Sequence, residues 1–343
     1  MRLLVIGNFG FINNKLDGQT VKTRSIYELL NKKKQDSDKI EFVNTENLMR
    51  SPGRITNFLT SFWFCDKLIL IPGRNSISYL FPFCYIFSLV LRFQIIHVAI
   101  GGWTDVFFEK NIIHRWIGKR IKAVLVENLH VKEALNNALG FTNVSVFPNF
   151  RNTFFVPEFN DSTPKLKLVY FSRIMMEKGI DTIFEIANAF KINHAAHKLS
   201  VDFWGQIEPK DEKYFFENVG KYDFMSYNGA LLPQKIHETL NMYDLLILPT
   251  KYFTEGFPGA ILDAYISGIP VLVSNWKHAK EFVKERESGF ICKMGDTSMF
   301  VSRINELIDN PELLANLKKG AYSESKKYSA EMAYEILLSK IMQ

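Results

Sequence analysis

Residues 245–271, LLILPTKYFTEGFPGAILDAYISGIPV, decide the expected fold of this chain. The apolar run 245–249 predicts a buried strand, and the loop after it leads into a helix expected at 258–267. Pro258 suits the first turn of that helix, because its missing N–H group would have no partner there. The N–H groups at and after Gly259, together with the helix dipole, favour an anionic ligand. This stretch therefore predicts a ligand site at the carboxyl edge of a parallel sheet.

Two carboxylates flank the start of the expected helix. Glu255 lies just before it, and Asp263 lies about two turns further along the chain. Two acids at this separation, beside a helix start that favours phosphate, suit a ligand with a sugar hydroxyl at one end and a ribose diol at the other. The alternative is an N-terminal acid and a solvated aspartate without a ligand.

A second charged cluster follows the strand expected at 166–172, in the sequence SRIMMEKG of residues 172–179. Arg173 and Lys178 lie on either side of a tight loop. An arginine fork and a lysine point charge together complement a diphosphate. The alternative is a pair of surface charges that open a helix, with Glu177 as their partner.

Apolar β-branched runs alternate with helical patterns through both halves of the chain. The other strands are expected at 2–6, 40–43, 67–71, 95–100, 123–127, 144–147, 199–204, 224–227, 270–274 and 289–292. The other helices are expected at 20–34, 77–91, 107–120, 130–139, 179–193, 233–241, 278–284, 297–308, 311–319 and 329–342. This alternation predicts an α/β fold with parallel sheets that are covered on both faces.

The second half of the chain resembles the donor domain of the family 4 retaining glycosyltransferases, of the bacterial surface-polysaccharide type. That family typically shows Gly-Arg-X-X-X-Glu-Lys-Gly, then a Glu and a second Glu eight positions later, then Gly-X-Pro-Val. The matching segments here are 172–179, Glu255 with Asp263, and 268–271. Ser172 replaces the first glycine, and Asp263 replaces the second glutamate with a side chain one methylene shorter.

The resemblance implies the GT-B fold, in which two Rossmann-like parallel-sheet domains face each other across a cleft. A chain of 343 residues also exceeds the size at which one core stops growing, about 250–300 residues. We expect an N-terminal acceptor domain over 1–152, a linker over 153–165 and a nucleotide-sugar donor domain over 166–325. A C-terminal helix over 326–343 is placed to pack back on the first domain.

The resemblance also implies roles for individual residues. Arg173 and Lys178 would hold the donor diphosphate and stabilise the leaving nucleotide, while Glu255 would bind hydroxyls of the donor sugar. The residues implied to bind the donor are Gly205, Asn228, Gly229, Leu231, Gly256, Phe257, Pro258, Gly259, Ala260 and Asp263. No metal site is expected, since the Asp-X-Asp motif of the other main transferase fold is absent. No cofactor is expected either, because a nucleoside-diphosphate sugar serves as co-substrate.

Loops of the first half are candidates for the acceptor side of the cleft. The loop after the first strand lacks the Gly-X-Gly-X-X-Gly order, which argues against NAD. In the resembling family a glycine-bearing loop at this place lies over the donor phosphates and beside the acceptor. The candidate acceptor and cleft residues are Gly10, Gly18, Gln19, Thr20, Gly102 and Trp103. Plain strand–helix loops are the alternative.

Charge is spread unevenly, with 19 Lys and Arg against 11 Asp and Glu in residues 1–150. A basic half suggests an anionic partner, and no nucleic-acid-binding motif is present. Residues 77–91 are apolar all round but shorter than the roughly 20 residues that span a membrane. They predict a buried helix, a peripheral contact with an anionic membrane or, least favoured, a span. The basic residues proposed to aid a membrane contact are Arg54, Lys67, Arg74 and Arg92.

These features predict a metal-independent retaining hexosyltransferase that moves a sugar from a nucleoside-diphosphate sugar to a glycan or lipid-linked acceptor. Its role would be in polysaccharide or lipopolysaccharide assembly. Three separated cysteines form no disulfide framework, and together with the resemblance they favour the cytoplasm, at the inner face of the cell membrane. The alternatives are another GT-B enzyme, a nucleotide-sugar epimerase or a phosphorylase, and a non-catalytic glycan-binding subunit.

Overall fold

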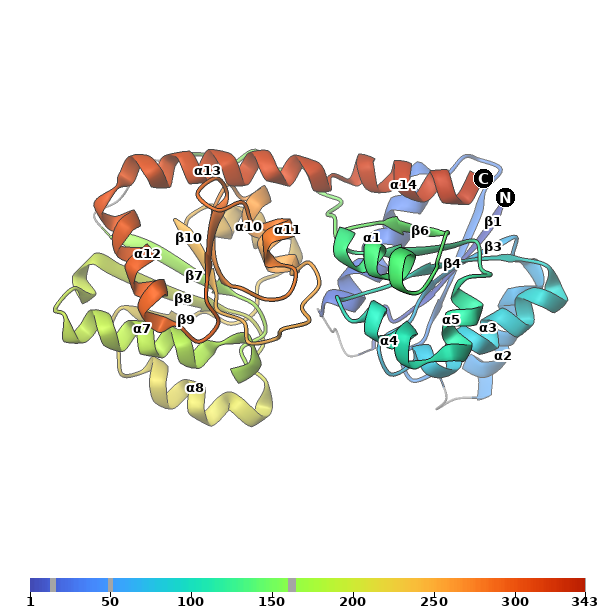
Figure 1. Ribbon diagram of the computed structural model, residues 1–343, viewed down its shortest axis with the longest axis horizontal. Coiled ribbons are helices and arrows are strands. Elements are labelled where there is room, and N and C mark those ends of the chain that lie inside the picture. The colour runs from blue at the N-terminus through green and yellow to red at the C-terminus, as the bar shows by residue number, and fades with distance from the viewer. Residues whose placement is uncertain (13–16, 49–51, 160–164, 343) are drawn as a thin grey trace. The chain divides into compact units, whose positions relative to one another are not determined.

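The computed structural model describes residues 1–12, 17–48, 52–159 and 165–342. It divides the chain into two compact units, which are described separately (Figure 1). Unit 1 comprises Met1–Thr153 and Tyr328–Gln343, and unit 2 comprises Phe154–Lys327. Each unit is built on a six-stranded sheet whose strands all pair in parallel. The predicted fold class, two parallel α/β sheets, is confirmed.

The sheet of unit 1 has the strand order β2-β1-β3-β4-β5-β6. Its strands are β1 (Arg2–Gly7), β2 (Lys39–Asn44), β3 (Lys67–Ile71), β4 (Gln94–Val98), β5 (Ala123–Val126) and β6 (Val144–Val146). Its helices are α1 (Gly18–Lys33), α2 (Pro52–Ser61), α3 (Ile77–Leu91), α4 (Thr104–Lys110), α5 (Ile112–Gly118), α6 (Leu129–Glu133) and α14 (Ala330–Met342), and the π-helical turn Ala134–Ala138 follows α6.

Side chains of β1 alternate between two hydrophobic clusters, because successive residues of a strand point to opposite faces of the sheet. Leu4 and Ile6 join the cluster formed with residues of α2, α3 and α5. Leu3 and Val5 join the cluster formed with residues of α1 and α14. Burial on both faces explains why these strands read as continuous apolar runs. No helix among the described residues is long and apolar enough to cross a membrane.

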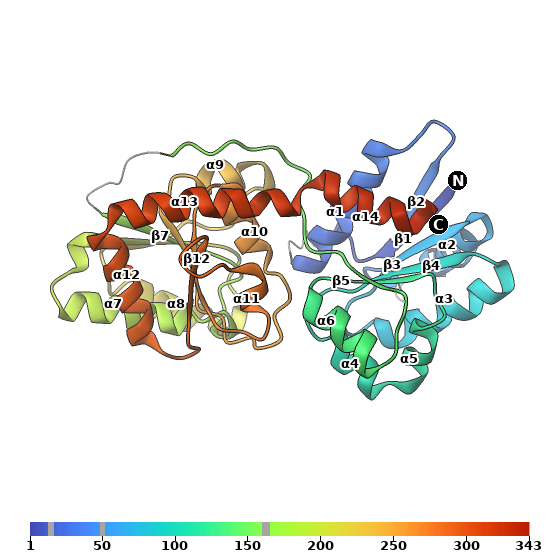
Figure 2. The ribbon, with the colours of Figure 1, turned by 45° about the horizontal axis from the view of Figure 1, so that its top comes forward.

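The last helix of the chain belongs to unit 1, as Figure 2 shows for α14 beside α1. Ala333, Leu337 and Ile341 of α14 are buried in the same cluster as Leu3 and Val5.

Of the segment expected as a linker, residues 154–159 belong to unit 2. Asn241 there holds both the N–H and the carbonyl of Glu158, each at 3.1 Å. Residues 160–164 lie outside the described part of the chain.

The sheet of unit 2 has the strand order β12-β11-β10-β7-β8-β9. Its strands are β7 (Leu166–Phe171), β8 (Leu199–Trp204), β9 (Met225–Tyr227), β10 (Leu245–Leu248), β11 (Val271–Ser274) and β12 (Gly289–Cys292). Its helices are α7 (Ile180–Ile192), α8 (Glu212–Val219), α9 (Ile236–Leu240), α10 (Gly259–Ile266), α11 (Ala279–Phe282), α12 (Thr297–Asp309) and α13 (Pro311–Ser325). The strand order reverses between β7 and β10, and ligands bind at such a switch point in open α/β sheets.

Several helices differ from their predictions: α13, expected at 311–319, continues to Ser325, and α9, expected at 233–241, covers Ile236–Leu240. The helix expected at 107–120 is two helices, α4 and α5, which are separated at Asn111. The side-chain amide of Asn111 donates to the carbonyl of Phe107 at 2.8 Å, and asparagine bonds of this kind compete with the helical ladder. The helices α2 and α8 were not predicted. Both are short, with 10 and 8 residues, and few of their side chains are buried, Phe58 in α2 and Phe215 and Val219 in α8.

The helix α3 continues through Pro82. Proline lacks the N–H group that would bond the carbonyl four residues earlier, which belongs to Ser78. That carbonyl is instead 3.1 Å from Nε2 of His114 in α5, which donates when the ring carries its proton there. A side chain of the neighbouring helix thus replaces the missing backbone bond and fixes α5 beside α3.

Candidate functional site

The two charged loops recognised in the sequence follow the two strands at the switch point of unit 2. The loop 172–179 follows β7, and the loop 249–258 follows β10. The two strands are neighbours in the sheet, with Leu168 opposite Leu245 and Val169 opposite Leu246. Both loops therefore leave the same edge of the sheet next to each other.

Lys178 and Glu255 meet between these loops. The amine Nζ of Lys178 lies 2.5 Å from Oε2 of Glu255, and both side chains are largely shielded from solvent. The hydroxyl of Thr250 lies 3.5 Å from the same carboxylate oxygen and 3.4 Å from the carbonyl of Glu177. The two residues that the sequence assigned to diphosphate and sugar are thus in direct contact, and an incoming anionic ligand would compete with Glu255 for the lysine.

Arg173 lies at the start of the first loop with a half-exposed side chain. Its Nη1 is 3.6 Å from Oε2 of Glu208, an exposed pair that contributes little to stability. Its carbonyl accepts a hydrogen bond of 2.7 Å from the hydroxyl of the buried Tyr170. The backbone of Arg173 is therefore fixed to the core, while its guanidinium group can turn toward a ligand.

Two glycines bring the backbones at this edge close together. Gly179 has φ of +83°, and a Cβ added there would lie 1.9 Å from the carbonyl oxygen of Pro249. Gly205, directly after β8, has φ of +148°, and a Cβ would lie 1.9 Å from the carbonyl oxygen of Ser172. These positions tolerate only glycine, because a side chain would force neighbouring strands apart.

Replacing Gly179 by alanine is expected to lower the melting temperature by more than the left-handed conformation alone would, since the methyl group also meets Pro249. The conformational cost by itself is about 1–2 kcal/mol. Gly295→Ala is the matched control, because Gly295 has φ of +77° and no atom within 4 Å of the added Cβ. Calorimetry of the two variants tests this. Equal losses in melting temperature for the two variants would mean that the loop 172–179 moves away from the added methyl group without a loss of stability.

The segment that leads into α10 is partly buried in the core of unit 2. Phe257 is buried and stacks on Phe282, with ring centroids 4.2 Å apart. Gly256 and Pro258 are also buried, and Ala260 is half-buried. Pro258 precedes the helix, which begins at Gly259, one residue later than expected. Any contact of this segment with a ligand would therefore be made by its backbone, as the sequence predicted.

The loop after β9 carries the remaining predicted donor residues. Asn228 is exposed, and its N–H bonds the carbonyl of Phe203 at 2.9 Å. The carbonyl of Gly229 accepts a bond of 2.8 Å from the N–H of Gly205. Leu231 is half-buried. The ends of β8 and β9 are thus tied together beside the loop 172–179.

In unit 1, the predicted acceptor residues follow β1 and β4: Gly10 lies in the loop after β1, Gly18, Gln19 and Thr20 form the first turn of α1, and Gly102 and Trp103 lie in the loop after β4. The N–H of Gly10 bonds the side chain of Asn8 at 2.9 Å. Asp17 caps α1 by accepting from the N–H of Thr20 at 2.9 Å, and Gly18 lies between them. The side chain of Gln19 lies against Gly73, in the loop after β3. The first turn of α1 and the loop after β3 therefore meet at the switch point of this sheet, between β1 and β3.

The loop after β4 contains Gly102, which is buried, and Trp103, which is half-buried. The guanidinium group of Arg74 lies over the Trp103 ring, 5.8 Å from its centroid. One predicted aromatic residue of the acceptor side is thus held by a basic residue of the neighbouring loop.

The comparisons with known proteins agree with this geometry. The family described as glycosyl transferases group 1 matches residues 152–324, half of the chain and all of the charged loops of unit 2. The chain belongs to this glycosyltransferase family. The resemblance seen in the sequence is confirmed.

The curated relatives of this family member are distant in sequence. It is 25% identical over 176 residues to the capsular polysaccharide biosynthesis glycosyltransferase CapM of Staphylococcus aureus, which covers 50% of this chain and 44% of CapM. It is 23% identical over 249 residues to the alpha-galactosylglucosyldiacylglycerol synthase of Streptococcus pneumoniae, covering 68% of this chain and 64% of that protein. The match to CapM thus spans less than half of that relative's length.

Solved structures show the same fold. HepE of Anabaena, solved in complex with UDP and glucose, has a TM-score of 0.76 at 13% identity over the whole of both chains. TarM has a TM-score of 0.65 at 20% identity, covering 80% of this chain and 54% of TarM. At these identities the likeness concerns the fold alone, and it supports the GT-B architecture for this chain.

Two polar contacts of this chain were not predicted from the sequence. Asp263 is buried, and its Oδ1 lies 3.2 Å from Nε2 of His237 in α9. In unit 1 the buried Lys22 lies 3.0 Å from Oε1 of the buried Glu127. Glu127 directly follows an apolar strand, which was a signal in the sequence. His237 gave no such signal, because its partner is 26 residues away.

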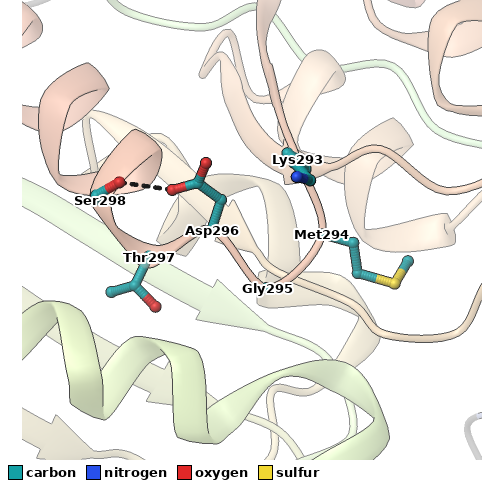
Figure 3. Close-up of a pocket in the computed structure, with 6 residues that line it drawn as sticks. All are labelled: Lys293, Met294, Gly295, Asp296, Thr297 and Ser298. Atoms are coloured by element: carbon teal, nitrogen blue, oxygen red, sulfur yellow. Dashed lines mark hydrogen bonds between the residues drawn. The ribbon is translucent and has the colours of Figure 1, made fainter.

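One open hollow in unit 2 lies apart from the predicted residues, at the loop between β12 and α12 (Figure 3). It is lined by Lys293, Met294, Gly295, Asp296, Thr297 and Ser298. Asp296 is already engaged there, since it accepts from the N–H of Met299 at 3.0 Å and from the Ser298 hydroxyl at 2.6 Å. The hollow therefore reflects a helix cap. Within the described residues, no three side chains are grouped as metal ligands.

Proposed function

We propose that this chain is a retaining glycosyltransferase that moves a hexose from a nucleoside-diphosphate sugar to an acceptor hydroxyl. The contact between Lys178 and Glu255 carries the proposal. It joins a cation for the donor diphosphate to a carboxylate for the donor sugar at the switch point of the family-matched unit. These are the two ends of the bond that the transfer breaks.

The proposed chemistry is mainly electrostatic. The bond between the anomeric carbon and the diphosphate oxygen breaks, and the diphosphate leaves with both bonding electrons. Arg173, Lys178 and the positive end of α10 stabilise the charge that develops on it. The acceptor oxygen attacks the same face and loses its proton to the departing phosphate, so the configuration is retained without an enzymic nucleophile.

The protein's own cations supply the positive charge that this step needs. We propose that the reaction requires no metal ion and no cofactor besides the donor. Asp263, held by His237, is the proposed partner of the ribose hydroxyls, and the proposed surroundings of the nucleotide are Gly205, Asn228, Gly229 and Leu231.

The acceptor is proposed to be a glycan or a lipid-linked glycan in polysaccharide or lipopolysaccharide assembly. Two relatives support this by their names. One, from Campylobacter jejuni, is an alpha-1,3-N-acetylgalactosaminyltransferase named for a diphospho-undecaprenol substrate, and one, from Streptococcus pneumoniae, is a glycolipid synthase. The loops of unit 1 around Gly18 and Trp103 are the proposed acceptor side, and the inner face of the cell membrane is the proposed place of action.

Thermal unfolding with UDP, GDP and ADP tests the donor site. A nucleotide that binds only the folded protein at a hundredfold over its Kd stabilises it by about 2.7 kcal/mol. We expect one nucleotide to raise the melting temperature of the wild type and not that of Arg173→Ala. Arg2→Ala is the matched control, since Arg2 is also half-exposed and also pairs with a carboxylate, that of Asp66 at 3.2 Å. No shift with any nucleotide, in a well-folded protein, would favour the non-catalytic subunit instead.

A further inference from the structure

Unit 1 carries an apolar surface that its own core does not use. The helix α3 buries one face, including Leu80, Phe81 and Cys84, and presents apolar side chains on the other. The helix α5 does the same, with Ile117 buried. The apolar side chains that remain outside are between 48% and 73% exposed. They form what we call the α3–α5 surface: Tyr79, Ile86, Leu89, Val90, Ile112, Ile113 and Trp116.

The two helices lie side by side, as Figures 1 and 2 both show. The bond between His114 and the carbonyl of Ser78 joins them, and the rings of Tyr85 and Trp116 meet edge to face with centroids 5.6 Å apart. The exposed residues of α3 and α5 therefore belong to one region of the unit. Apolar side chains gathered in this way on a protein surface mark an interaction site.

Most charges around this surface are positive, although the exposed Glu109 lies directly before Lys110. The helix α3 has no charged residue, and Arg92 follows it with an exposed side chain. Residues 110–122 contain five basic residues and no acidic one: Lys110, Arg115, Lys119, Arg120 and Lys122. The guanidinium group of Arg120 lies 3.8 Å from the centroid of the Trp116 ring. An exposed tryptophan and isoleucines beside a basic rim are typical of a helix that lies in the plane of a membrane surface.

We propose that the α3–α5 surface docks unit 1 on an anionic lipid bilayer. The apolar side chains enter the boundary between headgroups and acyl chains, and the basic residues contact lipid phosphates. A second copy of the chain fits less well, because a symmetric pairing of this surface would bring the basic residues of both copies together. A span is excluded for these helices, since α3 has 15 residues and α5 has seven.

Lys67 and Arg74, expected from the sequence to aid such a contact, are engaged elsewhere. Lys67 bonds the carbonyl of Ile341, and Arg74 lies over Trp103. The basic residues around α5 take their place, and these were not singled out in the sequence. The surface belongs to unit 1, whereas the loops 172–179 and 249–258 belong to unit 2, so it does not depend on the proposed transfer. If that function holds, the surface brings the acceptor side to lipid-linked glycans.

Vesicle flotation tests the proposal with the full chain. We expect binding to vesicles of phosphatidylcholine with phosphatidylglycerol, much weaker binding to phosphatidylcholine alone, and release by salt. The triple variant Ile112→Ser, Ile113→Ser, Trp116→Ser should partition at least roughly tenfold less. Lys119→Gln with Arg120→Gln should lose roughly fivefold for each charge removed.

The controls are matched in unit 2. Ile192→Ser removes an isoleucine that is 65% exposed, and Lys213→Gln removes an exposed lysine, so both should bind vesicles as the wild type does. The nucleotide-dependent shift in melting temperature should be unchanged in the variants of the α3–α5 surface. This result separates the membrane test from the test of the donor site. Wild-type-like binding by the triple variant would overturn the proposal. The proposal would also be overturned if sedimentation showed that the wild type is a dimer and that only the variants of the α3–α5 surface are monomers.

Discussion

Lys178→Ala is expected to lower the turnover of sugar transfer by roughly 10²–10³-fold, the usual effect of removing one group that stabilises developing charge. The loss should appear in kcat more than in KM, because the negative charge on the departing diphosphate grows only as the bond breaks. The loss is measured from initial rates of nucleotide release. The donor used is the one whose nucleotide raised the melting temperature of the wild type.

The same variant has a second expected consequence. Without the lysine amine 2.5 Å away, the largely shielded carboxylate of Glu255 would lose its cation, so the loop 249–258 should loosen. Lys178→Arg should restore part of the rate, since it keeps the charge but not the geometry. Lys213→Ala is the control, because Lys213 is an exposed lysine of unit 2 that pairs only along its own helix. Turnover within twofold of the wild type in Lys178→Ala would contradict the proposed role.

Glu127→Ala is expected to reduce the free energy of unfolding by about 3–5 kcal/mol, the cost of leaving one partner of a buried ion pair. The amine of Lys22 lies 3.0 Å from Glu127 and 3.2 Å from the carbonyl of Phe147, and both side chains are 2% exposed. Oε2 of Glu127 also accepts from the N–H of Gly101 at 3.0 Å. The variant would leave a buried ammonium group without its carboxylate and release the loop after β4. Urea unfolding at pH 7 measures the loss.

The dependence on pH gives this prediction a sign. Burial lowers the pKa of Lys22, and Glu127 opposes that shift. In the variant the pKa of Lys22 falls further, so the folded state binds fewer protons than the unfolded state. The stability of the variant should therefore rise with pH until the unfolded lysine titrates near its ordinary pKa of about 10.4. The double variant Lys22→Met, Glu127→Leu should recover most of the loss. A loss of about 1 kcal/mol or less in Glu127→Ala would contradict the argument.

The strands and the charged loops were readable from the sequence for a local reason. Strands of a parallel sheet are buried on both faces, so β10 and β7 appear as short apolar runs that end abruptly at polar loops. The residues after each run, 172–179 and 249–258, must then lie at the carboxyl edge. A longer apolar run predicted a helix at 77–91, and the structure shows α3 with these bounds.

Other features depended on partners far apart in the chain, and only the tertiary structure decided them. Lys178 meets Glu255, 77 residues away, because β10 pairs with β7 although β8 and β9 lie between them in sequence. Lys22 of α1 meets Glu127, which follows β5, across 105 residues, although β3 and β4 separate β1 from β5 in that sheet. His114 beside the carbonyl freed by Pro82 depends on how α5 packs on α3. Sequence alone determined which residues reach an edge or a surface, because buried segments appear in the sequence as local apolar patterns. Which of these residues contact each other was decided by the order of the strands and the packing of the helices, and these cannot be read from a local pattern.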